Sequence, residues 1–140
     1  MLLFALAAAA QPSFVCNAVS VWDGDGPITC ADGTKIRLAG IATREIDNRC
    51  RRGQPCPRPS GAAARDHLVS LLGGARGRTR HGAIRIGPVP LRCAPVGTSY
   101  GRTVAWCRRG TLDLSCAMVR GGYALRWPRY GGRQVCAQPR

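Results

Sequence analysis

The sequence predicts an α+β fold made mainly of β-strands, and three observations support this. Short segments rich in β-branched and aromatic residues alternate with turns rich in Gly and Asp. Two stretches have helical apolar spacing, and each ends at a glycine pair. The 140 residues are enough for one ordinary domain, and because only 6% are aromatic, aliphatic side chains and cysteine must fill the core.

Three strands are expected in the N-terminal third, and they span residues 14–22, 28–31 and 34–41. Turn chemistry separates them, first at Asp23-Gly24-Asp25-Gly26-Pro27 and then at the hairpin signal Asp32-Gly33. In the third strand, Ile36 and Leu38 alternate with Lys35 and Arg37. Since side chains alternate across a strand, Arg37 should lie opposite the apolar face.

A helix is predicted after a loop at residues 48–59 that is rich in Arg, Pro and Cys. Ser60 can cap it, and the apolar residues follow helical spacing at Ala64, Leu68, Leu71 and Leu72. Arginines of the loop (Arg49, Arg51, Arg52 and Arg58) either follow substrate phosphates or are simply solvated beside a disulfide.

Two further strands are expected at residues 83–93 and 103–108, and a second short helix at residues 113–120. Pro88 and Pro90 suggest that the first of these strands lies at an edge or contains a bulge. Three strands, a helix, two strands and a helix is the order of a five-stranded Greek-key barrel of the OB type, with two or three short helices. Residues 123–140 look irregular and basic.

The N-terminus predicts export. Residues 1–10 look like the apolar part of a secretory signal, with a small-residue cleavage site before Gln11. This run is too short to span a bilayer, and no other segment of the sequence qualifies. We therefore expect residues 11–140 to be one soluble domain, periplasmic or secreted, monomeric and without stable membrane insertion.

Eight cysteines predict a disulfide framework, because an even count in a short exported chain is typical of one. Local geometry favours Cys16–Cys30, Cys50–Cys56 and Cys93–Cys107, which leaves Cys116–Cys136. On the order of a hundred pairings are possible, so the pattern does not determine the connectivity. Zinc binding is the alternative, but the chain has no C-x-x-C pair and its histidines have no ligand-like spacing.

The charge of the chain points to a polyanionic partner. There are 21 Lys and Arg against 7 Asp and Glu, which gives a formal net charge of +14. In a compact fold these positive charges repel one another unless a polyanion or an anionic membrane surface binds and neutralises them.

Four segments occur in a characteristic order, and they read V-W-D-G-D at 21–25, I-R-L-A-G-I-A-T-R-E at 36–45, S-Y-G-R-T-V-A at 99–105 and D-L-S-C-A-M-V-R-G-G-Y-A at 113–124. Together they resemble the D-G-D, R-L-x-G-I-D-x-P-E, Y-G-R and D-L-x-x-x-L-V-R-x-G-x-A patterns of the staphylococcal nuclease (thermonuclease) family. The resemblance covers about residues 15–124, which is most of the predicted domain.

The resemblance implies hydrolysis of DNA and RNA phosphodiesters with Ca²⁺. It places Arg37 and Arg102 on the scissile phosphate and Glu45 beside the attacking water. Asp25, through its carboxylate, and Thr43, through its carbonyl, would be metal ligands, and Tyr100 would lie near the nucleotide. Asp23 matches the first acid of the turn. Such a set is chemically sensible, because guanidinium groups and a hard cation neutralise the charge that builds on the phosphoryl oxygens.

One departure from the pattern concerns the metal. Ala42 stands where the family has a metal-binding aspartate, and Arg44 stands where it has proline. Losing a carboxylate ligand should weaken Ca²⁺ binding, because affinity follows the charge and number of ligands. Asp47 is a possible substitute ligand, and Arg44 is a possible partner of Asp25 or a replacement for the metal charge.

The sequence thus predicts a Ca²⁺-dependent endonuclease that acts on DNA, RNA or both. The first alternative is a binding module that holds nucleic acid without cutting it, because Ala42 has removed a metal ligand. The second alternative is a disulfide-linked cationic protein that binds another polyanion or a membrane surface. Trp127, Tyr123 and Tyr130, which lie among arginines, resemble a surface on which single-stranded bases stack.

Overall fold

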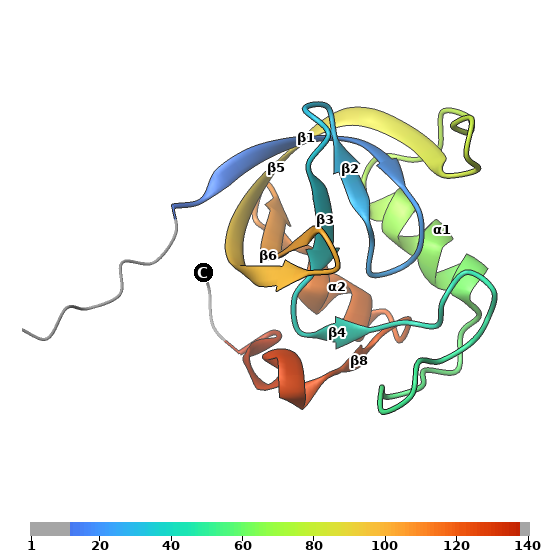
Figure 1. Cartoon of the computed structure of the whole chain (residues 1–140), viewed down its shortest axis with the longest axis vertical. Coiled ribbons are helices and arrows are strands. Elements are labelled where there is room, and N and C mark those ends of the chain that lie inside the picture. The colour runs from blue at the N-terminus through green and yellow to red at the C-terminus, as the bar shows by residue number, and fades with distance from the viewer. Residues whose placement is uncertain (1–11, 138–140) are drawn as a thin grey trace, which may run out of the picture.

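Six strands form one sheet in the computed structural model of this chain, which describes residues 12–137 (Figure 1). The strands of this sheet are β1 (Phe14–Val21), β2 (Ile28–Cys30), β3 (Lys35–Leu38), β5 (Ile84–Ser99), β6 (Arg102–Arg109) and β7 (Leu112–Asp113). A two-stranded sheet pairs β4 (Ile41–Ala42) with β8 (Leu125–Arg126). The predicted signal segment at residues 1–10 lies outside the described residues.

The helices are α1 (Gly61–Leu71) and α2 (Leu114–Arg120), followed by two 3₁₀ turns, η1 (Pro128–Tyr130) and η2 (Gly132–Gln134). The Ser60 side chain accepts a hydrogen bond from the amide of Ala63, which confirms the expected cap of α1. Asp113 caps α2 in the same way, by accepting from the amide of Cys116. None of the helices in this part of the chain is long and apolar enough to cross a membrane.

The order of strands in the main sheet is β3-β2-β1-β5-β6-β7, with antiparallel neighbours. The first strand in this order, β3, also pairs with β6, in parallel and in register from Ile36 opposite Thr103 to Leu38 opposite Ala105. The fold is therefore α+β and mainly sheet, as predicted. The double pairing of β3 matters for the site, because it brings Arg37 next to the strand that begins at Arg102.

Three predicted strands match the structure to within one residue at each end, and the other two differ by more. The third strand ends at Leu38 rather than at residue 41, because the chain turns at Gly40, which has φ +79°. A Cβ at Gly40 would lie 2.6 Å from the Trp106 ring, so only glycine lets the turn pack there. Ile41 and Ala42 then pair with β8 as a separate short strand.

The fourth predicted strand is longer than expected, and it runs to Ser99 as β5. It lies between β1 and β6, so the expectation of an edge strand is wrong. The expectation of a bulge is confirmed, because the β1–β5 register shifts where Ala18 pairs with Val89 and Ser20 pairs with Arg85. Pro88 falls inside this irregularity, where its missing N–H costs no ladder hydrogen bond.

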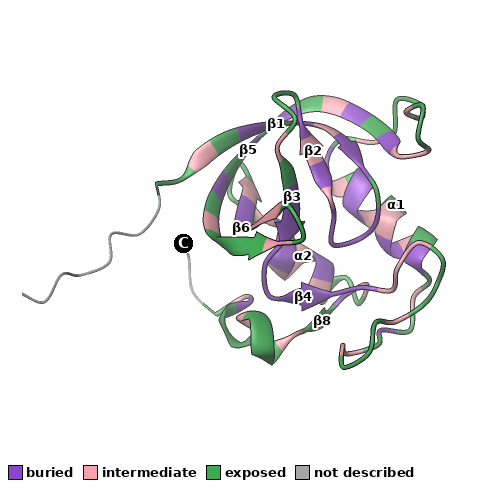
Figure 2. Ribbon diagram, in the orientation of Figure 1, coloured by how far each residue is buried: buried purple, intermediate pink, exposed green. Residues whose placement is uncertain are grey.

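The core lies between the sheet and the two helices, as the buried segments in Figure 2 show. Ile36, Leu38, Leu68, Leu72 and Leu114 are all fully buried. The predicted α1 stripe is confirmed for Ala64, Leu68 and Leu72, whereas Leu71 is only partly buried. Aliphatic side chains therefore supply most of the core, as the low aromatic content requires.

Four disulfides connect the elements, and their pairing matches the one that local geometry favoured. They are Cys16–Cys30 between β1 and β2, Cys93–Cys107 between β5 and β6, Cys116–Cys136 from α2 to the C-terminal segment, and Cys50–Cys56 within the basic loop. Disulfides of this kind persist in oxidising compartments.

Candidate functional site

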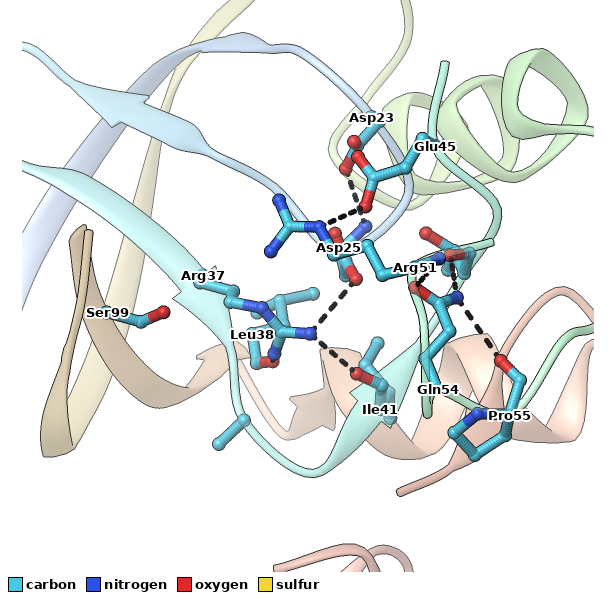
Figure 3. Close-up of polar contacts among 12 residues, drawn as sticks. Asp23, Asp25, Arg37, Leu38, Ile41, Glu45, Arg51, Gln54, Pro55 and Ser99 are labelled. Carbon is cyan, nitrogen blue, oxygen red and sulfur yellow. Dashed lines mark hydrogen bonds and ion pairs between the residues drawn. The ribbon is translucent and has the colours of Figure 1, made fainter. Parts of the chain in front are cut away.

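Charged side chains from separate segments meet at one end of the sheet, where β1 turns into β2. Asp23 and Asp25 lie in this turn, Arg37 on β3, Glu45 after β4, and Arg51 in the basic loop (Figure 3). The turn is closed by hydrogen bonds from the amide of Trp22 to the carbonyl of Pro27 and from the amide of Gly26 to that of Asp23. Segments far apart in sequence thus build one polar cluster.

Arg37 and Asp25 form a nearly buried ion pair. Arg37 Nη2 lies 3.3 Å from Asp25 Oδ2, and each side chain is only 9% exposed. Arg37 Nη2 also donates to the carbonyl of Ile41, and Nη1 donates to that of Leu38. The guanidinium lies 5.6 Å from the centre of the Trp127 ring, within the range of a cation–π contact. Arg37 is therefore held in place from several sides.

Asp23 is the buried acid of the cluster that has no cationic partner within the described residues. It is 3% exposed, and its Oδ1 accepts a hydrogen bond from the amide of Asp25 at 3.3 Å. Burial raises the pKa of the Asp23 carboxyl well above its usual range, and the nearby charges of Asp25 and Glu45 raise it further. The direction of this shift favours the protonated form of the Asp23 carboxyl when no cation is bound.

Glu45 forms an ion pair with Arg51 of the basic loop. Arg51 Nε lies 2.9 Å from Glu45 Oε1, and the Glu45 side chain is 26% exposed. In Figure 3 the Arg51 side chain extends across the cluster to reach Glu45. A predicted basic-loop residue thus becomes part of the site.

Thr43 directly follows β4 and is buried. The carbonyl of Thr43, the expected metal ligand, accepts a hydrogen bond from Gln54 Nε2 at 2.8 Å and keeps a second lone pair. Thr43 Oγ1 is buried and has no hydrogen-bond partner within the described residues. Ala42 is fully buried in β4, so no side chain replaces the carboxylate expected at that position.

Asp47, the possible substitute ligand, and Arg44, the possible partner of Asp25 or replacement for the metal charge, both have other partners. Arg44 Nε donates to the carbonyl of Pro57 at 2.8 Å and Nη1 to that of Asn48, so Arg44 holds the basic loop and does not pair with Asp25. Asp47 accepts a hydrogen bond from the amide of Arg49 and forms an exposed ion pair with its side chain. Neither residue joins the buried acids.

Tyr100 lies in the turn between β5 and β6, and Arg102 is the first residue of β6. Arg102 Nε donates to the carbonyl of Ser99 at 3.2 Å. Burial lowers the pKa of the Arg102 guanidinium, and the positive charges of Arg37 and Arg51 lower it further. Tyr100 is 92% exposed and has φ +50°, so the turn presents its ring to solvent. The structure therefore brings Arg102 close to Arg37 and Arg51.

Two neighbouring cavities flank the cluster. The first, of about 560 Å³, is lined by residues that include Asp23, Glu45, Arg51 and Arg102. The second, of about 380 Å³, is lined by residues that include Arg37, Arg51, Tyr100 and Trp127. Arg51 lines both of them, so it lies where the two cavities meet. Every predicted catalytic arginine or glutamate therefore faces one of the two cavities.

The predicted aromatic surface is only partly assembled. The rings of Trp127 and Tyr130 meet edge to face with their centroids 4.6 Å apart, and both residues line the second cavity. Tyr123 is directed elsewhere, because its ring stacks on His67 of α1 at 4.1 Å. Tyr100 completes the aromatic lining of the second cavity.

Sequence reasoning named Arg51 only as one of four loop arginines that either follow phosphates or are solvated, and it did not identify Gln54. The six-residue separation of Cys50 and Cys56 indicates a tight loop, but no sequence pattern shows that the loop folds back onto Thr43 and Glu45. Within residues 12–137, no group of three or more His, Cys, Asp or Glu side chains is arranged to hold a metal ion. The chain matches no protein-family model and no curated protein sequence.

Proposed function

We propose that this protein is an exported nuclease that hydrolyses phosphodiester bonds of DNA, RNA or both. The observation that carries the proposal is the convergence of Arg37, Glu45 and Arg102 on two adjoining cavities. Guanidinium groups neutralise the charge that grows on phosphoryl oxygens, and a carboxylate beside them can accept a proton from water. The resemblance of four ordered motifs to the staphylococcal nuclease family supports the same assignment.

The fold belongs to the same proposal. The pairing of β3 with both β2 and β6 links β1, β2, β3, β5 and β6 into a ring of hydrogen-bonded neighbours. We assign this ring to a five-stranded barrel of the OB type, with α1 between its third and fourth long strands. OB barrels commonly bind oligonucleotides on one face, which agrees with the net charge of +14.

A hard divalent cation such as Ca²⁺ fits the chemistry of the buried acids. Asp23 and Asp25 offer carboxylate oxygens, and burial, together with the nearby charge of Asp25, raises the pKa of the Asp23 carboxyl, which a bound cation would lower again. The buried Thr43 Oγ1 is a further oxygen without a partner in the described residues. When bound, such a cation would neutralise phosphoryl charge. Arg37 and Arg102 would orient the phosphate, and Glu45 would take the proton of the attacking water.

A binding module without catalysis is the second candidate, and the environment of Ala42 favours it. Ala42 is fully buried, Asp25 is already paired with Arg37, and Glu45 is already paired with Arg51. A cation would therefore have fewer free carboxylates than the family pattern provides. In this reading the same cavities hold a phosphate backbone and release it unchanged.

Cleavage of plasmid and single-stranded DNA by the oxidised protein tests the proposal, in Ca²⁺, in other divalent ions and in EDTA. Activity that disappears in EDTA and in Glu45→Gln would support a metal-dependent nuclease. An absence of cleavage in every ion, with binding retained, would favour the binding module.

Arg102→Ala separates the enzyme from a generic polyanion binder. Loss of a group that stabilises the transition state should lower turnover by about a hundredfold or more, with a much smaller effect on oligonucleotide affinity. Arg92→Ala is the matched control, because Arg92 is an exposed arginine on β5. Equal effects of the two substitutions would argue against a specific role for Arg102.

The location and the oligomeric state follow from the same proposal. Four disulfides fit a periplasmic or secreted protein. We propose that the protein acts as a monomer.

A further inference from the structure

We infer that Arg51 is a third phosphate-binding guanidinium of the site and that the Cys50–Cys56 loop holds it in position. This inference rests on the proposed function and adds a substrate-contacting residue to it. Arg51 and Arg102 would hold one backbone phosphate between them where the two cavities meet. The sequence left open whether the four loop arginines follow phosphates or are solvated, and it did not distinguish Arg51 from the other three.

The placement of Arg51 is the first argument. Arg51 is the residue that lines both cavities, and its side chain is 47% exposed, whereas that of Arg37 is 9% exposed. A ligand that enters either cavity can therefore reach Arg51. Arg37, which is largely buried, is less accessible from solvent.

The unused hydrogen-bonding capacity of Arg51 is the second argument. Both terminal nitrogens of Arg37 already donate, to Asp25, Leu38 and Ile41. Within residues 12–137, the Arg51 guanidinium has Glu45 as its one polar partner, and the contact is made through Nε. The two terminal nitrogens of Arg51 therefore remain available for a bidentate contact with phosphate, while Nε keeps Glu45 in place.

The attachment of the loop is the third argument, because it determines where the Arg51 backbone lies. The Cys50–Cys56 disulfide closes the loop, and the amide of Arg51 donates to Gln54 Oε1 at 2.9 Å. Gln54 Nε2 in turn donates to the carbonyl of Thr43, directly beside the site. A guanidinium group that is already held in position before substrate arrives loses less conformational entropy on binding than one on a free loop.

The charges around the cavities are the fourth argument. Arg37 and Arg51 both act on Arg102 with like charge, so three guanidinium groups repel one another around the two cavities. A bound phosphate would relieve this repulsion, as phosphates do in other arginine clusters.

Binding of a fluorescent single-stranded oligonucleotide in EDTA, measured by anisotropy over a range of salt concentrations, tests the role of Arg51. Arg51→Ala should weaken binding by about 10- to 100-fold, the worth of one charged hydrogen bond. It should also reduce the slope of log affinity against log salt by about 0.7, the value for one lost phosphate contact on a single strand. Arg51→Lys should recover only part of the affinity, because lysine lacks the planar fork.

Arg49→Ala is the matched control, since Arg49 belongs to the same loop but is 85% exposed and pairs with Asp47. If wild type binds the oligonucleotide and Arg51→Ala behaves like Arg49→Ala, the inference is wrong and the proposed function stands. If wild type binds no oligonucleotide, both the proposed function and the inference are wrong.

The role of the loop is tested by Cys50→Ser combined with Cys56→Ser, with and without Arg51→Ala. The serine variant should bind as weakly as Arg51→Ala, and adding Arg51→Ala should change the affinity by less than about twofold, because both act through one group. Gln54→Ala provides a second test that leaves the disulfide intact, and urea unfolding confirms that each variant is folded. Additive losses would show that the loop does not act through Arg51.

Discussion

The Arg37 guanidinium lies 3.3 Å from the Asp25 carboxylate, and this buried pair connects β3 to the turn between β1 and β2. A second pair, Arg51 with Glu45, lies above it and is partly exposed. Asp23 is the acid of this site that has no cationic partner among the described residues, and burial, with the nearby charges of Asp25 and Glu45, raises the pKa of its carboxyl. The site therefore contains two ion pairs, Arg37–Asp25 and Arg51–Glu45, and one buried acid, Asp23.

Loss of Arg37 should destabilise the protein strongly. Arg37→Ala leaves Asp25 buried without its partner, which should lower the free energy of unfolding by about 3–5 kcal/mol in urea unfolding. Adding Asp25→Asn should recover part of this loss, because the unpaired charge is then removed. Arg49→Ala breaks an exposed pair and should cost less than about 1 kcal/mol. If Arg37→Ala costs no more than Arg49→Ala, the pair has no structural role.

Asp23 should make the protein less stable as pH rises. Because its pKa is raised in the folded state, the folded protein keeps a proton that the unfolded chain releases above about pH 4. The free energy of unfolding contributed by this group therefore falls as pH rises from the ordinary Asp range through neutrality. Asp23→Asn keeps an oxygen for the amide of Asp25 and should flatten this dependence, with higher stability at pH 7.

Urea unfolding in EDTA at pH 5, 7 and 9 measures this difference. Asp32→Asn is the control, because hydrogen bonds from Thr34 lower the pKa of the exposed Asp32 carboxyl, so its linkage has the opposite sign. Parallel stability profiles for wild type and Asp23→Asn would show that Asp23 carries no unfavourable charge.

Restoring a carboxylate at position 42 should strengthen binding of Ca²⁺. Ala42 is buried in β4, next to Thr43 and close to the carbonyl of Ile41 that Arg37 contacts. Ala42→Asp should bind Ca²⁺ at least about tenfold more tightly than Ala42→Asn in calorimetry, because affinity follows ligand charge. The aspartate variant should also be less stable in EDTA and regain stability with Ca²⁺. If the two variants bind Ca²⁺ with equal affinity, the side chain at position 42 is not a ligand of the ion.

Gly61 should be required for the position of Glu45. A Cβ at Gly61 would overlap the backbone carbonyl of Glu45, so Gly61→Ala must displace either the start of α1 or the Glu45 segment. We expect a loss of about 1–3 kcal/mol in unfolding free energy, together with reduced cleavage. Gly97→Ala is the control, since no other atom lies within 4 Å of a Cβ placed there. Unchanged activity in a folded Gly61→Ala protein would contradict this dependence.

Local sequence patterns predicted most elements because each depends on short-range chemistry. The Ser60 cap, the apolar stripe of α1 and the Asp32-Gly33 hairpin all form as expected. The limits of β3 and β5 were predicted less well, since they depend on distant partners. Trp106 packs over the turn at Gly40, and β1 accommodates the bulge beside Pro88.

The sequence by itself determined the strand-rich α+β fold and favoured the four cysteine pairs, because both depend on residue type and spacing along the chain. The candidate set Asp25, Arg37, Glu45 and Arg102 came from the resemblance of four ordered motifs to a known family. Only the tertiary structure decided which charges are paired, because pairing depends on distances across separate segments. It joined Arg37 to Asp25, turned Arg44 towards the basic loop and brought Arg51 to Glu45. Burial, which depends on packing around the whole turn, raised the pKa of Asp23.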